Sequence, residues 1–592
     1  MEPKARQHDR LRTSGNCKVK PGASHPNNKT SDHRLSFNGL PPSHSRYQST
    51  RTSLIFHPCG GILGPFDANG SFGARIQSKN VRQLATRGAG ATLVSGVVSL
   101  GVQMAGTVVL ARLLTPRDFG LVTMVTTFSL LLLNFGLNGF TEAIVQREDV
   151  SHALASNLFW INVGCSALLA LGFASAGTWL ARLYKDPHVA GVTEAIAVTI
   201  FVTGLQVMPI ALLKRAMRFA EASANDVVAR GVAIAVSIVF AWLGWGYWAL
   251  VAGAIALPVS TCLGAWILCR WIPGLPRRAA GTGSAVKFAV NIYARFSTGY
   301  FTNNVDNFLV GWRLGSVPLG YYKKAYDLFI LSSNQLSTGL TIVAVSALSR
   351  LQADAAQYRR YLLSALAVMA FVGMGISGDL ALIGKDLILL ILGPRWSESG
   401  AIFTIFSPGI GMMLLYGTHV WIHLSIGRAD RWFRWGLVDL VTTTAALCVG
   451  LHWGAKGVAV AWVVAYWLIT FPALWYAGRP IQFGIGPVVS AVWRYMLAAL
   501  AAYLVAVFLI GKMQAFAAGP EPLWVAVRIL SFSALFVALY FGAVIAFHRS
   551  LEPVHLLVGL TREMVSRRRV EEQEVEDWEE EEPGKDALAR AK

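Results

Sequence analysis

The sequence predicts an all-α integral membrane protein of about 14 transmembrane helices, with two six-helix lobes related by an internal repeat and two additional C-terminal helices. The first observation behind this fold class is the composition. Of the 592 residues, 54% are hydrophobic and 14% are charged, and the mean hydropathy is +0.48, whereas soluble globular proteins carry about 25% charged residues. The second is a close succession of apolar stretches, and the third is a duplication of polar segments between them.

The apolar stretches are long enough to cross a membrane, because about 20 helical residues span the hydrocarbon core. The segments between them are short, and none is long enough to form a folded domain. The expected spans are 89–112, 119–141, 154–182, 189–213, 224–244 and 247–271 in the first lobe, 286–312, 319–348, 361–383, 399–426, 432–452 and 457–477 in the second lobe, and 488–511 and 524–547 after it.

Two polar segments, one in each predicted lobe, resemble each other. Residues 112–120 read Arg-Leu-Leu-Thr-Pro-Arg-Asp-Phe-Gly, and residues 313–320 read Arg-Leu-Gly-Ser-Val-Pro-Leu-Gly. The dipeptide at 245–246, Trp-Gly, likewise recurs at 453–454. Secondary transporters are built from such repeats, with the substrate path at the repeat interface. The duplication therefore predicts a transport protein.

The chain divides into five parts by composition: a disordered basic N-terminal tail (1–85), an N-terminal lobe (86–280), a C-terminal lobe (281–480), two additional transmembrane helices (481–548) and a charged tail (549–592). The formal net charge of +19 arises from the first tail and from arginine-bearing loops, so we expect no nucleic-acid partner. The distribution of lysine and arginine among the loops predicts that both termini are cytoplasmic.

The span 286–312 is the most polar of the chain. Lys287, Asn291 and Arg295 recur at four-residue steps and therefore share one helix face. Because such a face would be unfavourable against lipid, we expect it to line a polar lumen between the lobes. The candidate lumen residues are Arg112, Lys287, Asn291, Arg295, Asn303, Asn304, Asp306, Arg313, Lys323, Lys324 and Asp327.

Arginine and lysine at membrane depth suit a diphosphate, because a guanidinium fork pairs with phosphate oxygens. Asparagine, serine and tyrosine suit sugar hydroxyls. The predicted ligand is therefore an anionic amphiphile with a hydrophilic head. For single residues a structural alternative stays open, in which Asp306 and Asp327 neutralise Arg295, Arg313 or Lys324 in ion pairs.

Other polar residues inside spans are weaker candidates. Asp379 and Asp439 are either proton or sodium sites or helix-packing groups, and the packing role is favoured. His419 and His423 have the spacing of a metal pair, but no carboxylate or cysteine follows them closely, so a packing role is favoured here too. The six cysteines show neither metal-site nor disulfide spacing. We expect no catalytic residue, no metal and no cofactor.

A longer motif overlaps the polar span. It runs Asn304-x-Asp306-x-x-Leu309-x-Gly311-x-x-Leu314-Gly315-x-x-x-Leu319-Gly320-x-Tyr322-x-x-Ala325-Tyr326. This motif resembles the seventh and eighth helices of the polysaccharide transporter family, within the multidrug/oligosaccharidyl-lipid/polysaccharide exporter superfamily. Residues 111–120, 349–354 and 392–396 are similar to other segments of the family. The resemblance covers about 82–480, and the long polar N-terminus is not typical of the family.

The resemblance implies a flippase that moves an undecaprenyl-diphosphate-linked oligosaccharide across the bacterial inner membrane by alternating access, for exopolysaccharide, capsule or lipopolysaccharide O-antigen biosynthesis. In some members a proton or sodium gradient drives transport. The implied partners are the lipid-linked oligosaccharide, membrane lipids, and the polysaccharide polymerase and export machinery. Candidate diphosphate contacts are Arg112, Arg295, Arg313, Lys323 and Lys324.

Other functions stay open at this point. A small-molecule or drug exporter or a lipid II flippase of the same superfamily is one, although the arginine-bearing polar span suits a phosphorylated head better than an apolar drug cation. A polytopic membrane glycosyltransferase or polymerase is another, but the loops are short and an internal repeat has no purpose in such an enzyme. A scaffold would give no role to charges inside spans.

Overall fold

The computed structural model describes residues 65, 66, 72, 78–147, 149–277, 281–512 and 522–549. These residues belong to one compact unit, Gly60–Lys592. Most of the predicted N-terminal tail, and the charged tail from residue 550 onward, lie outside the described residues.

The described residues form a series of helices joined by short turns. The helices of the first half are α1 (Ser78–Leu113), α2 (Pro116–Val145), α3 (His152–Ser175), α4 (Gly177–Tyr184), α5 (His188–Arg215), α6 (Phe219–Trp242) and α7 (Tyr247–Cys269). The later helices are α8 (Thr282–Leu314), α9 (Ser316–Arg350), α10 (Ala355–Leu392), η1 (Pro394–Trp396), α11 (Ser397–Phe406), η2 (Ser407–Gly409), α12 (Ile410–Ser425), α13 (Ala429–Gly450), η3 (Leu451–Trp453), α14 (Gly454–Gly478), η4 (Arg479–Ile481), α15 (Ile485–Lys512) and α16 (Pro522–His548).

Eleven helical stretches among the described residues are long and apolar enough to cross a membrane. The chain is therefore an all-helical, multi-pass membrane protein. Helices α8 and α9 have 33 and 35 residues and are not among the eleven; they coincide with the spans that we predicted to be most polar. The count of 14 spans and the repeat organisation stay predictions.

Three boundaries differ from those expected. Helix α1 begins at Ser78, inside the stretch 1–85 that we assigned to a disordered tail, because the helix continues through polar residues that carry no apolar signal. The expected span 154–182 is divided between α3 and α4 at Ala176. The expected span 399–426 is interrupted at Ser407–Gly409, where Pro408 has no backbone N–H to donate.

The turns at the two predicted polar junctions are tight. At the start of α2, the Asp118 carboxylate accepts hydrogen bonds from the backbone N–H of Thr115 at 2.8 Å and from its hydroxyl at 2.6 Å, while the Thr115 hydroxyl accepts from the Asp118 N–H. This reciprocal capping box satisfies donors at the start of the helix. Between α8 and α9 the chain turns at Gly315, whose φ of 91° favours glycine.

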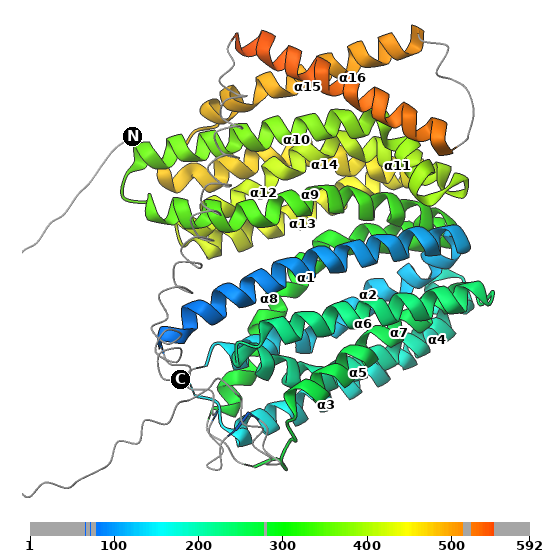
Figure 1. The fold of residues 1–592 in the computed structure, drawn as a ribbon, viewed down its shortest axis with the longest axis vertical. Coiled ribbons are helices and arrows are strands. Elements are labelled where there is room, and N and C mark those ends of the chain that lie inside the picture. The colour runs from blue at the N-terminus through cyan, green and yellow to red at the C-terminus, as the bar shows by residue number, and fades with distance from the viewer. Residues whose placement is uncertain are drawn as a thin grey trace, which may run out of the picture. The chain divides into compact units, whose positions relative to one another are not determined.

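Helix α8 connects the two halves of the unit. In the first half α2 packs along α5, and α6 packs between α1 and α7; in the second half α10 packs along α11, α12, α15 and α16. Helix α8 packs along α2 and also contacts α13, and α2 contacts α9 as well. Figure 1 shows α10, α15 and α16 at one edge of the described helices and α3 and α5 at the opposite edge.

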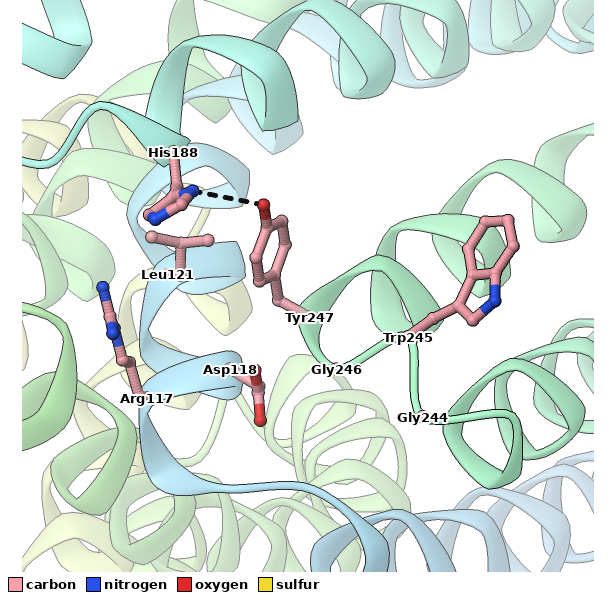
Figure 2. Close-up of a pocket in the computed structure, with 8 residues that line it drawn as sticks. All are labelled: Arg117, Asp118, Leu121, His188, Gly244, Trp245, Gly246 and Tyr247. Atoms are coloured by element: carbon pink, nitrogen blue, oxygen red, sulfur yellow. Dashed lines mark hydrogen bonds between the residues drawn. The ribbon is translucent and has the colours of Figure 1, made fainter.

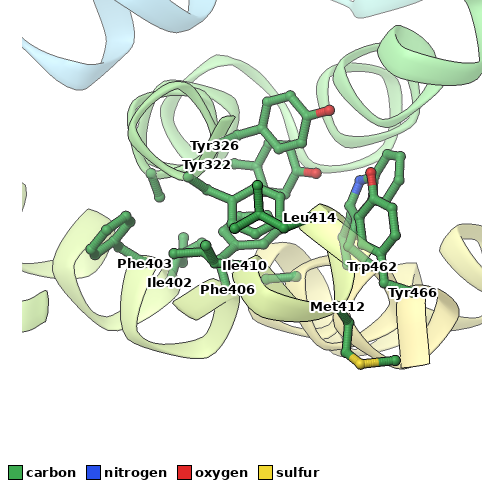
Figure 3. Close-up of a cluster of buried hydrophobic side chains, with 14 of the residues drawn as sticks. Tyr322, Tyr326, Ile402, Phe403, Phe406, Ile410, Met412, Leu414, Trp462 and Tyr466 are labelled. Atoms are coloured by element: carbon green, nitrogen blue, oxygen red, sulfur yellow. The ribbon is translucent and has the colours of Figure 1, made fainter. Parts of the chain in front are cut away.

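An aromatic core holds the second half together (Figure 3). The ring of Phe406 lies 4.9 Å from that of Phe329 and 5.8 Å from that of Tyr326. Tyr326 in turn lies 5.9 Å from the ring of Trp462. Offset and edge contacts at these distances are favourable beyond the burial of apolar area. Helix α9 is thereby fixed against α11 and α14.

Candidate functional site

Helix α8 has an aromatic face that packs against α2. The hydroxyl of Tyr293 donates a hydrogen bond to the carbonyl oxygen of Leu131 at 3.0 Å, and the hydroxyl of Tyr300 donates to that of Thr127 at 2.7 Å. Positions seven residues apart lie on the same helix face. This face therefore fixes the rotation of α8 relative to α2.

The predicted polar stripe lies on the other side of α8. At about 100° of rotation per residue, positions 287 and 291 are turned roughly 120–160° away from Tyr293. Lys287 and Asn291 are exposed, as is Asn303, whose amide donates to the Gly299 carbonyl at 2.9 Å. The side chain of Arg295 is outside the described part of the chain. The role of these residues as substrate contacts stays a prediction.

The two polar junctions that resemble each other in sequence lie directly against each other. A Cβ atom placed on Gly120 would overlap the carbonyl oxygen of Ser316, and a Cβ placed on Gly320 would overlap the carbonyl oxygen of Pro116. The contact is thus reciprocal. Gly120, near the start of α2, lies against the backbone at the start of α9, and Gly320, near the start of α9, lies against the backbone at the start of α2. Only residues without a side chain allow this close approach.

Side chains from both halves surround this contact. Arg112 donates from Nη2 to the Leu390 carbonyl at 2.9 Å, and the buried Trp396 donates from Nε1 to the Ala111 carbonyl at 2.8 Å. The ring of Trp396 also lies 5.4 Å from that of Phe119. We name these residues, with Lys324, the junction cluster: Ala111, Arg112, Phe119, Lys324 and Trp396. The cluster closes the helix bundle at the end where α1 stops and α2 starts.

The basic residues of α8 and α9 do not form one cluster together with the polar stripe of α8. The ammonium of Lys324 lies 4.0 Å from the centroid of the Phe119 ring, while Lys323 forms an ion pair of 2.6 Å with Asp327 one helical turn further on. Arg313 is exposed at the end of α8 and has no hydrogen bond or ion pair to any other described residue. Lys324 therefore belongs to the junction cluster, whereas Asp327 neutralises Lys323.

Asp306 is fully buried and connects three helices. Its carboxylate accepts hydrogen bonds from the hydroxyl of Tyr322 on α9 at 2.7 Å, from the indole Nε1 of Trp462 on α14 at 3.2 Å and from the backbone N–H of Asn307 at 2.7 Å. Among the described side chains these partners are neutral donors, and neither Arg313 nor Lys324 of the structural alternative is one of them. Asn304, two residues before Asp306, donates to the Tyr300 carbonyl at 3.0 Å. In this structure Asp306 supports the site and does not line an open path.

Other polar groups inside the spans also have partners from neighbouring helices. Asp439 accepts from the hydroxyl of Tyr416 at 2.7 Å, as expected of a helix-packing group. Arg528 on α16 donates to both oxygens of Asp386 on α10, at 2.7 and 2.5 Å, which fastens the last helix to the second half. Sequence reasoning did not identify this ion pair.

Two further contacts of the site were missed from the sequence. Trp396 lies in the quoted segment 392–396, but nothing there indicates that its indole reaches the end of α1. Trp462 donates to a carboxylate 156 residues earlier in the chain. The only signal for either was the presence of an indole N–H in an apolar environment, which needs a buried partner.

Comparisons with known proteins agree with this architecture. Residues 109–401 match the family described as "Polysaccharide biosynthesis protein". The chain is 21% identical over 428 residues to the succinoglycan biosynthesis transport protein ExoT of Rhizobium meliloti (strain 1021), covering 72% of this chain and 86% of the relative. It is 20% identical over 410 residues to the lipopolysaccharide biosynthesis protein WzxC of Escherichia coli (strain K12), covering 68% and 82%.

Solved structures share the fold. The lipid II flippase MurJ in its inward closed conformation aligns with a TM-score of 0.62 at 13% identity, covering 79% of this chain and 99% of that one. An inward-facing multidrug resistance MATE family transporter of the MOP superfamily aligns with a TM-score of 0.53 at 13% identity, covering 65% and 98%. The chain is therefore similar in sequence to polysaccharide biosynthesis and transport proteins, as the resemblance seen in the sequence implied, and it shares the fold of MurJ and of the MATE transporter.

Proposed function

We propose that the chain is a flippase that translocates a lipid-diphosphate-linked oligosaccharide across the bacterial inner membrane by alternating access, for exopolysaccharide, capsule or O-antigen biosynthesis. Two lines of support come from the comparisons. The named relatives are proteins of succinoglycan transport and lipopolysaccharide biosynthesis, and the fold is that of transporters. Translocation breaks no covalent bond, so the proposal requires no catalytic residue and no cofactor.

The observation that carries the proposal is the exposed polar stripe of α8. Polar and charged side chains within membrane-spanning segments usually face a cavity or a partner, so an exposed Lys287 and Asn291 on a helix between α2 and α13 suit a water-filled path. Lys287 would pair with a phosphate oxygen of the lipid diphosphate, and Asn291 would bind a sugar hydroxyl. An apolar drug cation would be repelled by the same lysine.

The direction of opening follows from the proposed orientation. With the N-terminus in the cytoplasm, α1 runs outward, so the junction cluster lies on the periplasmic side and the start of α8 on the cytoplasmic side. In this orientation the contact between α2 and α9 would close the periplasmic end. Opening that end while the cytoplasmic end closes would complete alternating access, driven by a proton or sodium gradient.

Deleting the chain in its host tests the proposal. We expect loss of surface polysaccharide together with accumulation of an intact lipid-diphosphate-linked oligosaccharide on the cytoplasmic leaflet, because synthesis continues while translocation stops. The polymerase and export machinery would then lack their substrate. Unchanged polysaccharide with increased sensitivity to cationic drugs would contradict the proposal and favour a drug exporter, and arrest of peptidoglycan synthesis would favour a lipid II flippase.

Point variants connect this phenotype to α8. A chain with Lys287→Ala and Asn291→Ala should fail to restore polysaccharide although it is produced at normal levels. Lys512→Ala is the matched control, because Lys512 is an exposed lysine at the end of α15 and lies far along the chain from the stripe. If the double variant restored polysaccharide as well as the Lys512→Ala chain does, the stripe would have no part in transport.

A further inference from the structure

A cavity of about 290 Å³ lies at the same end of the bundle as the junction cluster (Figure 2). Its walls come from three helix starts that are distant in sequence. Arg117 and Asp118 belong to the first turn of α2, His188 begins α5, and Tyr247 begins α7. Figure 2 shows the ring of Tyr247 between His188 and Asp118, with Leu121 beside them.

The polar groups of this cavity are held in place and still free to bind. One oxygen of Asp118, Oδ2, is fixed by the capping box with Thr115, whereas Oδ1 has no hydrogen bond to any other described residue and lies 3.3 Å from the position of a Cβ on Gly246. Arg117 is exposed and makes only a long ion pair of 3.8 Å with Asp186. Helix α2 thus presents a fixed carboxylate with one oxygen free among the described residues and, at the preceding position, a guanidinium without a close partner there.

The opposite wall offers an aromatic ring and a bare backbone. The hydroxyl of Tyr247 lies 3.3 Å from Nδ1 of His188, which orients the ring and leaves its face toward the cavity. Gly244 and Gly246 have φ values of 80° and 56°, a conformation that favours glycine and keeps side chains out of this wall. The exposed indole of Trp245 points away in Figure 2, because it packs edge-on against Phe240 at 4.6 Å.

This set of groups suits one ligand class. Neighbouring hydroxyls of a sugar ring accept from a guanidinium and donate to a carboxylate, and the C–H face of the ring packs against an aromatic side chain. A phosphate would be repelled by Asp118 and by Asp186 behind it, and an apolar molecule would leave the polar wall unsatisfied. We propose that this cavity binds a sugar residue of the glycan after translocation, at the periplasmic exit; this inference rests on the proposed function.

The similar dipeptide of the second half has different polar surroundings. There the dipeptide Trp453-Gly454 is followed by Lys456, whose ammonium forms an ion pair of 2.9 Å with Glu398. The polar groups in that place already satisfy each other and have no need of a ligand. Among the described residues the arrangement around Tyr247 therefore differs from that around Trp453–Gly454, where a lysine and a glutamate pair with each other.

Binding by the purified full-length chain tests the inference. The probe is the oligosaccharide released by mild acid from the host's own lipid-linked intermediate, which carries neither lipid nor diphosphate, and the measurement is isothermal titration calorimetry in detergent. Tyr247→Ala and Arg117→Gln should each weaken binding by about tenfold, because each removes one principal contact. Matched controls should bind as the unchanged chain does: Trp242→Ala removes an exposed tryptophan outside the cavity, and Arg182→Gln removes an exposed arginine of the neighbouring α4.

The outcomes separate this inference from the proposed function. No binding by the unchanged chain, or equal binding by Tyr247→Ala, would overturn the exit site. Loss of binding in the Lys287→Ala/Asn291→Ala chain with full binding in Tyr247→Ala would assign the sugar to the stripe of α8 and also overturn it. If the deletion strain accumulates lipid-linked oligosaccharide but the purified chain does not bind the released glycan, the proposed sugar site at the exit is wrong and the proposed flippase function is still supported.

Discussion

Replacing Gly120 by alanine should force open the end of the bundle that the junction cluster closes. The added methyl group would overlap the Ser316 carbonyl oxygen and come within 3.0 Å of the Gly320 backbone nitrogen. Both obstacles are backbone atoms, so no side-chain rotation relieves the overlap. Helices α2 and α9 must separate, and the hydrogen bonds from Arg112 and Trp396 across the junction lengthen with them.

The size of the effect follows from the cost of overpacking. Forcing an extra methyl group into a closely packed contact costs about 1–3 kcal/mol, and about 1.4 kcal/mol corresponds to a factor of ten in an equilibrium constant. The closed state should therefore lose roughly 5- to 150-fold in population relative to a state open at this end. Alanine also has a higher helix propensity than glycine by about 1 kcal/mol, but this gain is present in both states and cancels.

Thiol labelling measures this shift. Leu319 is fully buried beside the junction, so a Leu319→Cys chain, with the six native cysteines replaced by alanine or serine, should react slowly with a membrane-impermeant maleimide added from the periplasmic side. Adding Gly120→Ala should raise the labelling rate by about tenfold or more. Gly320→Ala should act in the same direction, because its contact with Pro116 is the reciprocal one.

Gly101→Ala provides the matched control for this experiment. Gly101 lies in α1, and a Cβ there meets nothing within 4 Å, so the substitution changes helix propensity without crowding a contact. Labelling of the Gly120→Ala chain at the rate of the Gly101→Ala chain would refute the reasoning, since it would mean that the contact between α2 and α9 does not hold this end closed.

Three further predictions concern buried polar contacts. Tyr322→Phe should lower the free energy of unfolding by about 1.5–3 kcal/mol, because it removes a charge-assisted hydrogen bond from the buried Asp306 carboxylate; thermal unfolding in detergent checks this, and an unchanged midpoint would contradict it. A double-mutant cycle of Asp386→Asn and Arg528→Gln should give a coupling energy of about 1–3 kcal/mol, whereas additive effects would show that the ion pair does not fasten α16. Trp396→Phe should cost about 1–2 kcal/mol by leaving a buried carbonyl unpaired and should raise the labelling of Leu319→Cys; a rate equal to that of the unchanged chain would exclude Trp396 from the closing contact.

The sequence predicted the spans well because apolar length is a local property. Most expected spans coincide with helices of the structure, including α5 and α13 to within a few residues at each end. The interruption at Pro408 was missed because the apolar signal continues through it. The start of α1 was missed for the opposite reason: its first residues are helical but polar, so they give no apolar signal.

The site was only partly predictable because side-chain partners depend on helix rotation. The polar stripe of α8 was predicted from its spacing; Lys287 and Asn291 are exposed in the structure, and their place in a lumen stays a prediction. Asp306 was grouped with the same stripe by proximity in sequence, yet it turns inward to Tyr322 and Trp462. The duplicated junctions were recognised as a repeat, but their direct contact through Gly120 and Gly320 required the relative placement of α2 and α9, which one sequence does not contain.

The proposed function requires that the exposed stripe of α8 form the path of a lipid-diphosphate-linked oligosaccharide. Translocation by purified chain in liposomes tests it most directly, with the host's own lipid-linked oligosaccharide as substrate and a membrane-impermeant glycosidase or lectin reporting its arrival at the opposite leaflet. We expect translocation by the unchanged chain and by Lys512→Ala, and a loss of at least about tenfold in rate for Lys287→Ala/Asn291→Ala, because two polar substrate contacts are removed. Translocation by the double variant at the unchanged rate would contradict it.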